Sequence, residues 1–368
     1  MTISLLLLVL LYIILIVLNY KSYTDNKVNV ALTIITAVLS VFMLFSAKSA
    51  DLDWSETELD VSGYRTIYEV YDVLEHEDFN MYYLFYGSMY LGQLFGFSFR
   101  TWWIIMSIMA MSVICIATKI HKYSLNLFLA TFMAYHEIVF YSGIKFFYGF
   151  CFFLLAYGFL FWKTTKGQLL FVLFTCLAGG FHTMYYLFLI LLVKPLRKPK
   201  RFVALIVSIT IIFTILMRLS GSAISFMMPF FNALDNEHVN RYTLSEVHAG
   251  FYFAVLLHLV VVFIAYSVRK YKKTNGHDSI DADTLFYTVM ISLLFCPFYS
   301  VSLIFMRLIT SFSLVVITAS SGIMKESYHS RLLCTNLSLL YVIASYIMRM
   351  VMGSGFFQTS IVPYFDVF

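Results

Sequence analysis

Long apolar segments recur along the whole chain and are separated by short polar stretches. Each is close to the roughly 17–25 residues that a helix needs to cross the hydrocarbon core of a bilayer. The pattern therefore predicts about ten to twelve transmembrane helices. The apolar segments are approximately 3–20, 28–47, 100–118, 124–141, 146–162, 168–193, 202–218, 249–268, 284–299, 302–323 and 332–350.

Composition supports the same fold class. Hydrophobic residues make up 61% of the 368 residues and charged residues 12%, whereas a soluble domain carries about 25% charged residues. We therefore expect an all-α polytopic bundle forming a single transmembrane domain over residues 1–368, with extracytoplasmic loops at about 48–99 and 219–248. Met1–Tyr20 has no basic start and no small-residue cleavage site, so it is expected to be the first spanning helix.

The charges predict the orientation, because short basic loops stay on the cytoplasmic side. Acidic residues fill the 48–80 loop and recur in the 219–248 loop, so both loops are expected outside, as are both termini. The basic clusters expected inside are Lys21/Lys27, Lys119/Lys122, Lys163/Lys166, Lys194 to Arg201, Arg269 to Lys273 and Lys325/Arg331.

Segment 168–193 has basic loops on both sides and is interrupted by Gly179 and Gly180. A re-entrant hairpin of two short helices, with His182 near its apex in an outward-facing cavity, would keep both basic loops inside. Paired glycines permit the bend, and irregular backbone within a membrane is tolerated where it lines protein or a wet cavity. The alternative is one long tilted helix with a kink.

Tyr82–Phe97 is aromatic, uncharged and interrupted by three glycines. A crossing here would move the Lys119/Lys122 cluster outside. We therefore expect an interfacial helix on the outer leaflet, where tyrosine and tryptophan are enriched.

Five cations disobey the orientation rule, because they fall at or near outer helix ends: Arg100, Lys145, Arg218, Arg307 and Arg349. Arg307 would lie roughly 7–8 Å inside its helix at about 1.5 Å per residue. Snorkelling to outer headgroups explains such a residue in part, but an embedded cation is a functional hypothesis by default. A group of outer cations fits the phosphate or pyrophosphate of a lipid carrier, which arginine binds bidentately and lysine as a point charge.

His136 and Glu137 lie near the outer end of the fourth helix, and His182 lies at the hairpin apex. A lone membrane histidine is usually a packing residue, but two near one cavity favour substrate contact. In the first outer loop, Asp60 is followed by Tyr64 at helical spacing, although acids in such loops are usually only solvated.

No nucleotide-binding glycine loop, GxSxG or HExxH motif occurs, so the sequence lacks the motifs that usually indicate nucleotide-dependent or metal-hydrolase chemistry. The cysteines lie in apolar runs without a CxxC pair, which favours buried packing over disulfides or zinc. No cofactor and no metal site is expected, and an activated lipid substrate would need neither.

At these residues the chain resembles the EpsG/Wzy family of bacterial exopolysaccharide and capsule repeat-unit polymerases, over about residues 55–365. The family usually has Gly-Ile/Val-Arg-Gln where this chain has Gly143-Ile144-Lys145-Phe146. The other matching motifs are Asp60 with Tyr64, the aromatic helix near Tyr82, Ala178 to His182 (the family's Ala-x-x-Phe-His), Met306-Arg307-Leu308 and the tail with Pro363-Tyr364.

The resemblance implies a GT-C-like membrane glycosyltransferase that uses an undecaprenyl-pyrophosphate-linked donor at the outer leaflet of the bacterial plasma membrane. Asp60 would be the first candidate for the base, His182 the second and Glu137 the third. Arg307 and Lys145 would stabilise the departing pyrophosphate. Tyr64, His136 and Arg218 are further candidates for substrate contact.

Two other functions stay open. One is a single-residue or ligase-type transferase that uses a polyprenyl-linked glycan, and the other is a flippase or transporter of lipid-linked oligosaccharide. The expected partners are the lipid-linked oligosaccharide, membrane lipid and, by resemblance, a flippase and a chain-length regulator; no nucleic acid is expected.

Overall fold

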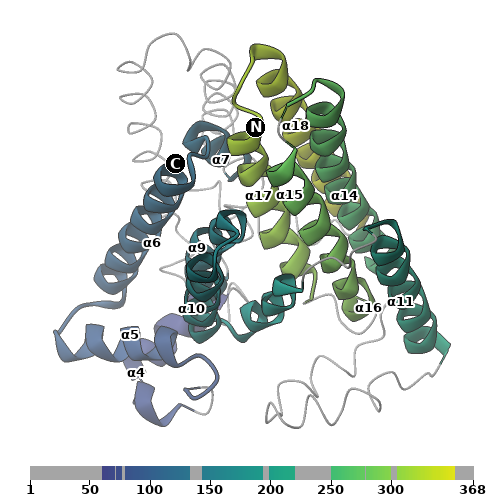
Figure 1. Ribbon diagram of the computed structural model, residues 1–368. Helices are drawn as coiled ribbons and strands as arrows, with labels where there is room; N and C mark the ends of the chain where they lie inside the picture. The colour runs from purple at the N-terminus through teal and green to yellow at the C-terminus, as the bar shows by residue number, and fades with distance from the viewer. Residues whose placement is uncertain are drawn as a thin grey trace. The chain divides into compact units, whose positions relative to one another are not determined.

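Every regular element in the described part of the computed structural model is helical (Figure 1), which confirms the predicted all-α polytopic fold class. The first two expected spans, the end of the fourth and most of the 219–248 loop lie outside the described residues. The structure describes residues 60–70, 72–76, 79–132, 143–193, 199–219, 250–277, 279–299 and 305–352.

The chain divides into two compact units, one made of residues 1–189 with 317–368 and the other of residues 190–316. The expectation of a single transmembrane domain stays a prediction. The helices of unit 1 are α4 (Asp60–Val70), η2 (Val73–Glu75), α5 (Tyr83–Leu94), α6 (Phe99–His121), α7 (Leu125–Thr131), α9 (Ile144–Phe159), η4 (Leu160–Trp162), α10 (Thr165–Phe181), most of η5 (Thr183–Leu192), the end of α17 (Met306–Ile323) and α18 (Tyr328–Met352).

Unit 2 holds the remaining elements. They are the end of η5, α11 (Pro199–Leu219), α14 (Gly250–Thr274), α15 (Ile280–Ser292), η6 (Leu293–Phe295), α16 (Cys296–Tyr299) and the first part of α17. The described helices from α6 onward lie on the apolar segments of the sequence and differ from them by a few residues at their ends. The helices α4, η2 and α5 lie within the stretch 48–99, which was expected to be a loop.

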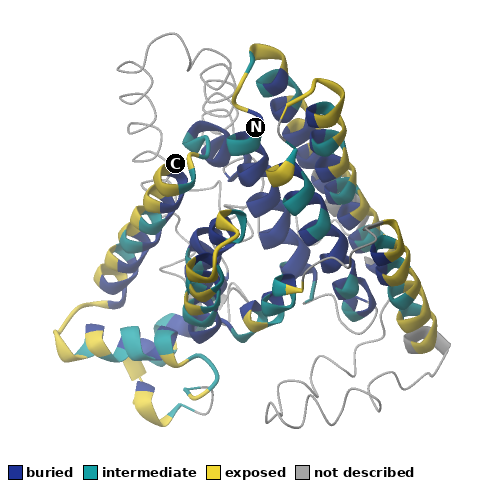
Figure 2. Cartoon of the chain, in the orientation of Figure 1, coloured by how far each residue is buried: buried dark blue, intermediate teal, exposed yellow. Residues whose placement is uncertain are grey.

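Among the described residues, five helical segments are long and apolar enough to cross a membrane: Phe99–His121, Ile144–Trp162, Phe251–Thr274, Ile280–Tyr299 and Met306–Ile323. Two of them, α6 and α14, have exposed residues along one side (Figure 2), and many of these residues are apolar. On α6 these side chains are Ile105, Ile108, Ile116 and Ile120. Contiguous apolar surface of this kind is unusual on a soluble monomer, and it fits contact with lipid.

The aromatic segment before α6 forms a separate short helix. α5 has 12 residues, or about 18 Å at 1.5 Å per residue, which is less than the hydrocarbon core of a bilayer. It lies across the start of α6 instead of continuing it (Figure 1). The turn between them ends where the Ser98 side chain accepts a hydrogen bond from the Thr101 N–H and caps α6. The predicted outer-leaflet position of α5 stays a prediction.

The segment predicted to contain a hairpin is broken at His182. α10 packs antiparallel to α9, with the Phe181 ring on Phe152 and the Phe174 ring on Phe159. His182 is extended and ends α10.

η5 then runs along α9 in the same direction as α9, and therefore in the direction opposite to α10. The Tyr185 hydroxyl donates to the Phe146 carbonyl near the start of α9, and the Phe188 ring stacks on Phe153 further along it. The chain therefore reverses at His182, as the hairpin prediction requires and a single kinked helix does not.

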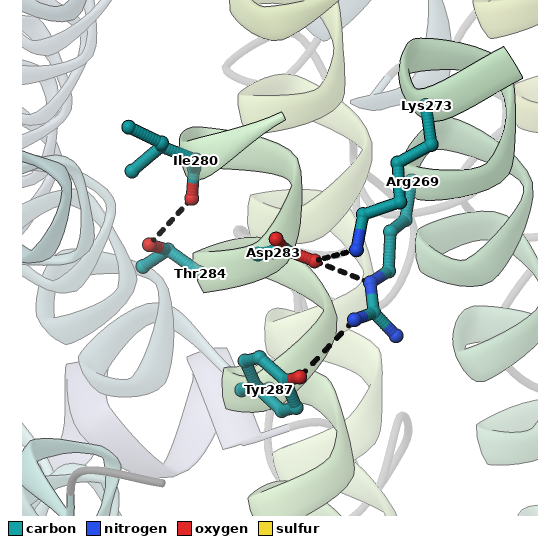
Figure 3. A network of polar contacts seen from close by, with 6 residues as sticks. All are labelled: Arg269, Lys273, Ile280, Asp283, Thr284 and Tyr287. Carbon is teal, nitrogen blue, oxygen red and sulfur yellow. Dashed lines mark hydrogen bonds and ion pairs between the residues drawn. The ribbon is translucent and has the colours of Figure 1, made fainter. Parts of the chain in front are cut away.

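In unit 2, a polar network joins the end of α14 to the start of α15 (Figure 3). The Asp283 carboxylate accepts from Arg269 Nε and lies 3.0 Å from Lys273 Nζ. Arg269 Nη2 also donates to the Tyr287 hydroxyl at 3.1 Å. Two residues of the predicted cytoplasmic basic cluster are thus paired with an acid on the next helix.

His258 is buried inside the same unit, where α15 gives way to η6 and α16. Its Nδ1 lies 3.0 Å from the Tyr299 hydroxyl and its Nε2 lies 2.8 Å from Ser292 Oγ. The two ring nitrogens therefore connect the end of α15 to the end of α16. Both nitrogens have a hydrogen-bond partner, as is usual for a buried structural histidine.

Candidate functional site

Lys145 lies in the first turn of α9, directly after the Gly143-Ile144 start of the helix. Its side chain is partly buried and its ammonium faces tyrosine rings. Nζ lies 3.8 Å from the ring centroid of Tyr82, 5.4 Å from that of Tyr64 and 5.9 Å from that of Tyr86. All three distances are within the range of cation–π attraction, which is about 6 Å.

The tyrosines come from α4, from the residue that precedes α5, and from α5 itself. Tyr64 packs edge-on against Phe85 at 5.0 Å between ring centroids, which holds α4 against α5. Tyr64 and Tyr86 are 7% and 1% exposed, so both rings are held in place by the residues packed around them. Tyr82 is less buried, and its carbonyl accepts the first hydrogen bond of α5 from the Tyr86 N–H.

Tyr68 strengthens the contact between α4 and α5 one helical turn after Tyr64. Its hydroxyl donates to the Phe97 carbonyl at 2.9 Å, and its own carbonyl accepts from Gln93 Nε2 at 2.6 Å. Burial raises the pKa of the Tyr68 phenol, so the hydroxyl stays a donor even above the pH at which an exposed tyrosine ionises.

His182 brings a second polar group to the same cluster. Its side chain is 3% exposed, and its ring lies 5.3 Å from the Tyr82 ring and 5.0 Å from the Phe146 ring. Nδ1 accepts a hydrogen bond from the Met184 N–H at 3.4 Å, so the side chain caps η5. Because Nδ1 accepts, a neutral ring carries its proton on Nε2.

Two glycines allow these segments to come close. A Cβ on Gly180 would lie 2.7 Å from Leu84 and 2.8 Å from Tyr83, at the contact of α10 with α5. A Cβ on Gly149 would lie 2.6 Å from the Tyr185 ring and 2.9 Å from a backbone oxygen of α10. At both positions a larger residue would require neighbouring atoms to move, and at Gly149 one of these is a backbone oxygen.

We call the following five residues the lysine–tyrosine cluster: Lys145, Tyr64, Tyr82, Tyr86 and His182. They come from four separate stretches of sequence within unit 1. An ammonium group, tyrosine hydroxyls and an imidazole N–H are all donors that suit the oxygens of a phosphate or a sugar.

The structure brings together three of the residues predicted for the site, namely Lys145, His182 and Tyr64. Asp60 is the first residue of α4, one turn before Tyr64, and its side chain is not described. His136 and Glu137 lie outside the described residues.

The two predicted arginines belong to unit 2. Arg218 is near the end of α11, where side chains are not described. Arg307 is the second residue of α17 and is partly buried. Residues 300–304 lie outside the described part of the chain, so the expected depth of Arg307 stays a prediction. Lys145 and His182 belong to unit 1, so the convergence of Arg307 with them also stays a prediction.

Sequence reasoning missed Tyr82, Tyr86 and His76 as members or neighbours of the site. His76 stacks on Tyr86 at 4.8 Å between ring centroids. The aromatic run that begins at Tyr82 was predicted as an interfacial helix and as a motif of the family, but no residue of it was predicted for the site, because so aromatic a chain gives no signal for which rings face a cation. The one available signal was the tyrosine content of that run, since tyrosine carries a polar tip on an apolar ring.

Comparison with known proteins identifies the family. The model of the EpsG family matches residues 49–365, nearly the span over which the sequence motifs resemble that family. No curated protein and no solved structure matches the chain. The matched region includes every residue of the lysine–tyrosine cluster and covers most of the 368 residues. The chain therefore belongs to the EpsG family, the family of Wzy-type polysaccharide polymerases.

Proposed function

We propose that this membrane protein joins oligosaccharide repeat units carried on undecaprenyl pyrophosphate, at the outer leaflet of the plasma membrane. Membership of the family implies a polysaccharide polymerase-type membrane protein. The observation that carries the finer proposal is the lysine–tyrosine cluster. It places a partly buried ammonium group and a buried histidine against the same ring, that of Tyr82, at motifs through which the sequence resembles the family.

The reaction makes one glycosidic bond and breaks one bond to phosphate. The acceptor sugar hydroxyl attacks the anomeric carbon of the donor glycan, and its oxygen forms the new C–O bond. The bond between that carbon and the pyrophosphate oxygen breaks, and the pyrophosphate leaves with the electron pair. The hydroxyl proton passes to a base on the protein. Negative charge therefore grows on the leaving group in the transition state.

Lys145 is the proposed partner of that growing charge. A preorganised donor aimed at developing charge in a site shielded from water is worth about 3–4 kcal/mol. Lysine acts as a point charge and does not form the bidentate contact of arginine, so this chain would hold the pyrophosphate with one fewer fixed hydrogen bond than relatives with arginine at this position.

His182 is proposed to donate to the substrate from Nε2. The hydrogen bond that Nδ1 accepts from the Met184 N–H supports this protonation state. A ring with its proton on Nε2 does not take up another proton at that atom, which favours Asp60 over His182 as the base. Asp60 is one helical turn before Tyr64, a member of the cluster.

Arg307 is proposed as a second cation for the pyrophosphate. Arg218, His136 and Glu137 are proposed substrate contacts, with Glu137 also the third candidate for the base. A chain-length regulator and a flippase are the proposed protein partners.

The decisive experiment reconstitutes the full chain in liposomes with undecaprenyl-pyrophosphate-linked repeat units and analyses the glycan products by size. A ladder of products spaced by one repeat unit is expected. A single shifted species would instead indicate the single-residue or ligase-type transferase. Movement of the lipid across the bilayer without any new glycosidic bond would indicate the flippase, and either result would replace the polymerase proposal.

A further inference from the structure

We infer that Tyr82 is a positioning residue that holds the Lys145 ammonium in place for the pyrophosphate leaving group. The inference rests on the proposed function and adds a residue outside the predicted site. Tyr82 lies at the centre of the cluster, because its ring is 3.8 Å from Lys145 Nζ and 5.3 Å from the His182 ring.

Distance distinguishes Tyr82 from the other two tyrosines. Attraction between a cation and the quadrupole of a ring falls steeply as the two separate. At 3.8 Å the ammonium touches the face of Tyr82, whereas the centroids of Tyr64 and Tyr86 are 5.4 Å and 5.9 Å away. Tyr82 therefore supplies the strongest of the three cation–π contacts.

The backbone makes Tyr82 suitable for this role. Tyr82 is the N-cap of α5, and its carbonyl accepts from the Tyr86 N–H at 3.0 Å. Its ring also packs on Tyr86 at 6.4 Å between centroids. Lys145 in contrast has a long flexible side chain that loses considerable rotamer freedom when it is fixed. A ring anchored to a helix start can restrict the ammonium before the substrate arrives.

The ring face acts on the reaction through Lys145. An ammonium that is already oriented does not have to be ordered as charge develops on the pyrophosphate, so the benefit belongs to the transition state. Weakening the ring face should lower kcat, while the KM for the donor should change by less than about twofold.

The test replaces Tyr82 in the full-length protein with phenylalanine and then with mono-, di- and trifluorophenylalanine, introduced at an amber codon. The rings keep nearly the same size while each fluorine withdraws electron density from the face. kcat should fall by about 3- to 30-fold in total between phenylalanine and the trifluoro ring, and its logarithm should decrease steadily with each fluorine added. The same series at Tyr90, a partly buried residue of α5 outside the cluster, is the matched control and should change kcat by less than about twofold.

A second measurement needs no polymerase activity. The rate at which an amine-specific acylating reagent modifies Lys145 is followed by peptide mass spectrometry in the same variants. A weaker ring face stabilises the ammonium less, so more of the reactive neutral amine is present and acylation should speed up along the Tyr82 series. The Tyr90 series should leave the rate nearly constant.

The outcomes separate the two proposals. A wild-type protein that makes no ladder, but whose Lys145 acylation follows the Tyr82 series, would overturn the polymerase function and support the contact. A wild-type ladder with a flat or rising kcat series at Tyr82 would overturn the positioning role alone. Equal declines at Tyr82 and Tyr90 would also overturn it, because they would reflect a general effect of fluorinated rings in this part of the protein.

Discussion

At the scale of single residues, Lys145 illustrates how a cation is accommodated in an apolar helix pair. Most of its neighbours along α9 are apolar and buried, and removal of an ammonium from water is costly without compensation. Three tyrosine faces supply part of that compensation while the charge is kept. The cost of keeping such a group points to a use for the charge beyond stability.

Substitution of Lys145 by methionine keeps most of the apolar stem of the side chain and removes the ammonium group. We expect initial rates of polymerisation to fall by about 100-fold or more, because one oxyanion-type interaction is lost. Lys145→Arg should retain most of the rate. The matched control is Lys166→Met, at an exposed position in the first turn of α10, and full activity of Lys145→Met would remove the residue from the mechanism.

The two nitrogens of His182 have separable roles. The amide of asparagine can replace Nδ1 as the cap of η5 but does not reach the position of Nε2, whereas glutamine reaches Nε2 and loses the cap. We expect His182→Asn to remain folded and to lose about 100-fold in rate. His182→Gln should lose about 1 kcal/mol of stability and keep more activity. Rates and thermal unfolding together check this, and the reverse order of activities would assign catalysis to Nδ1.

Asp60 is tested as the base by its amide analogue. Asp60→Asn preserves size and removes the ability to take up the hydroxyl proton, so kcat should fall by about 10²- to 10⁴-fold with little change in the KM for the donor. Steady-state kinetics on lipid-linked repeat units measure both parameters. An increase in KM with unchanged kcat would show that Asp60 binds substrate and does not act in proton transfer.

At the scale of elements, the pair α9 and α10 carries the site. The Phe152–Phe181 and Phe159–Phe174 stacks fix the register of the two helices. The reversal at His182 then returns η5 to α9, where Phe146 packs on both His182 and Tyr185. Phe146 stands where the family usually has glutamine, and in this chain it holds the histidine ring by packing.

A comparison of two glycines tests the importance of this close packing. Gly149→Ala should destabilise the protein by about 1–3 kcal/mol, because the new methyl group meets the Tyr185 ring and a backbone oxygen that cannot rotate away. Gly87→Ala in α5 is the control, since nothing lies within 4 Å of its Cβ position, and it should be neutral or stabilising by up to about 1 kcal/mol. Thermal unfolding in detergent measures both, and equal midpoints would show that the helix pair can open to admit a methyl group.

A break in segment 168–193 was predictable from its interrupted apolar run, but the paired glycines remain inside α10 and the chain turns after them, at His182. The return of η5 along α9 was favoured only through the charges of the flanking loops, since local sequence does not say which neighbour a helix will pack on. The packing is decided by rings such as Phe153 and Phe188, which are far apart in the chain.

At the scale of the whole molecule, exposed apolar side chains on α6, α14 and other helices fit a multi-pass membrane protein (Figure 2). The orientation in the membrane is a prediction from charge alone. It places the acidic stretch that contains Glu75 outside and the basic end of α14 inside.

Single cysteines at two exposed positions test that orientation. In a variant without the five native cysteines, Glu75→Cys should react with a membrane-impermeant thiol reagent added to intact cells. Asn275→Cys, directly after α14, should react only after the membrane is opened. Both positions are exposed, so burial does not explain a failure to react, and the opposite pattern would invert the topology and exclude an outer-leaflet site.

The sequence by itself determined the helical segments that the structure describes from α6 onward, a break near His182 and two of the polar residues at the site, Lys145 and His182. These follow from hydropathy, glycine and charge, whose effects are local along the chain. Only the tertiary structure decided that Tyr82 and Tyr86 face Lys145 and that the Nδ1 atom of His182 is used as a cap. Helical spacing shows which side chains share a face of one helix, but it does not show which faces of different helices pack together. The cation–π and ring contacts of the site depend on that packing.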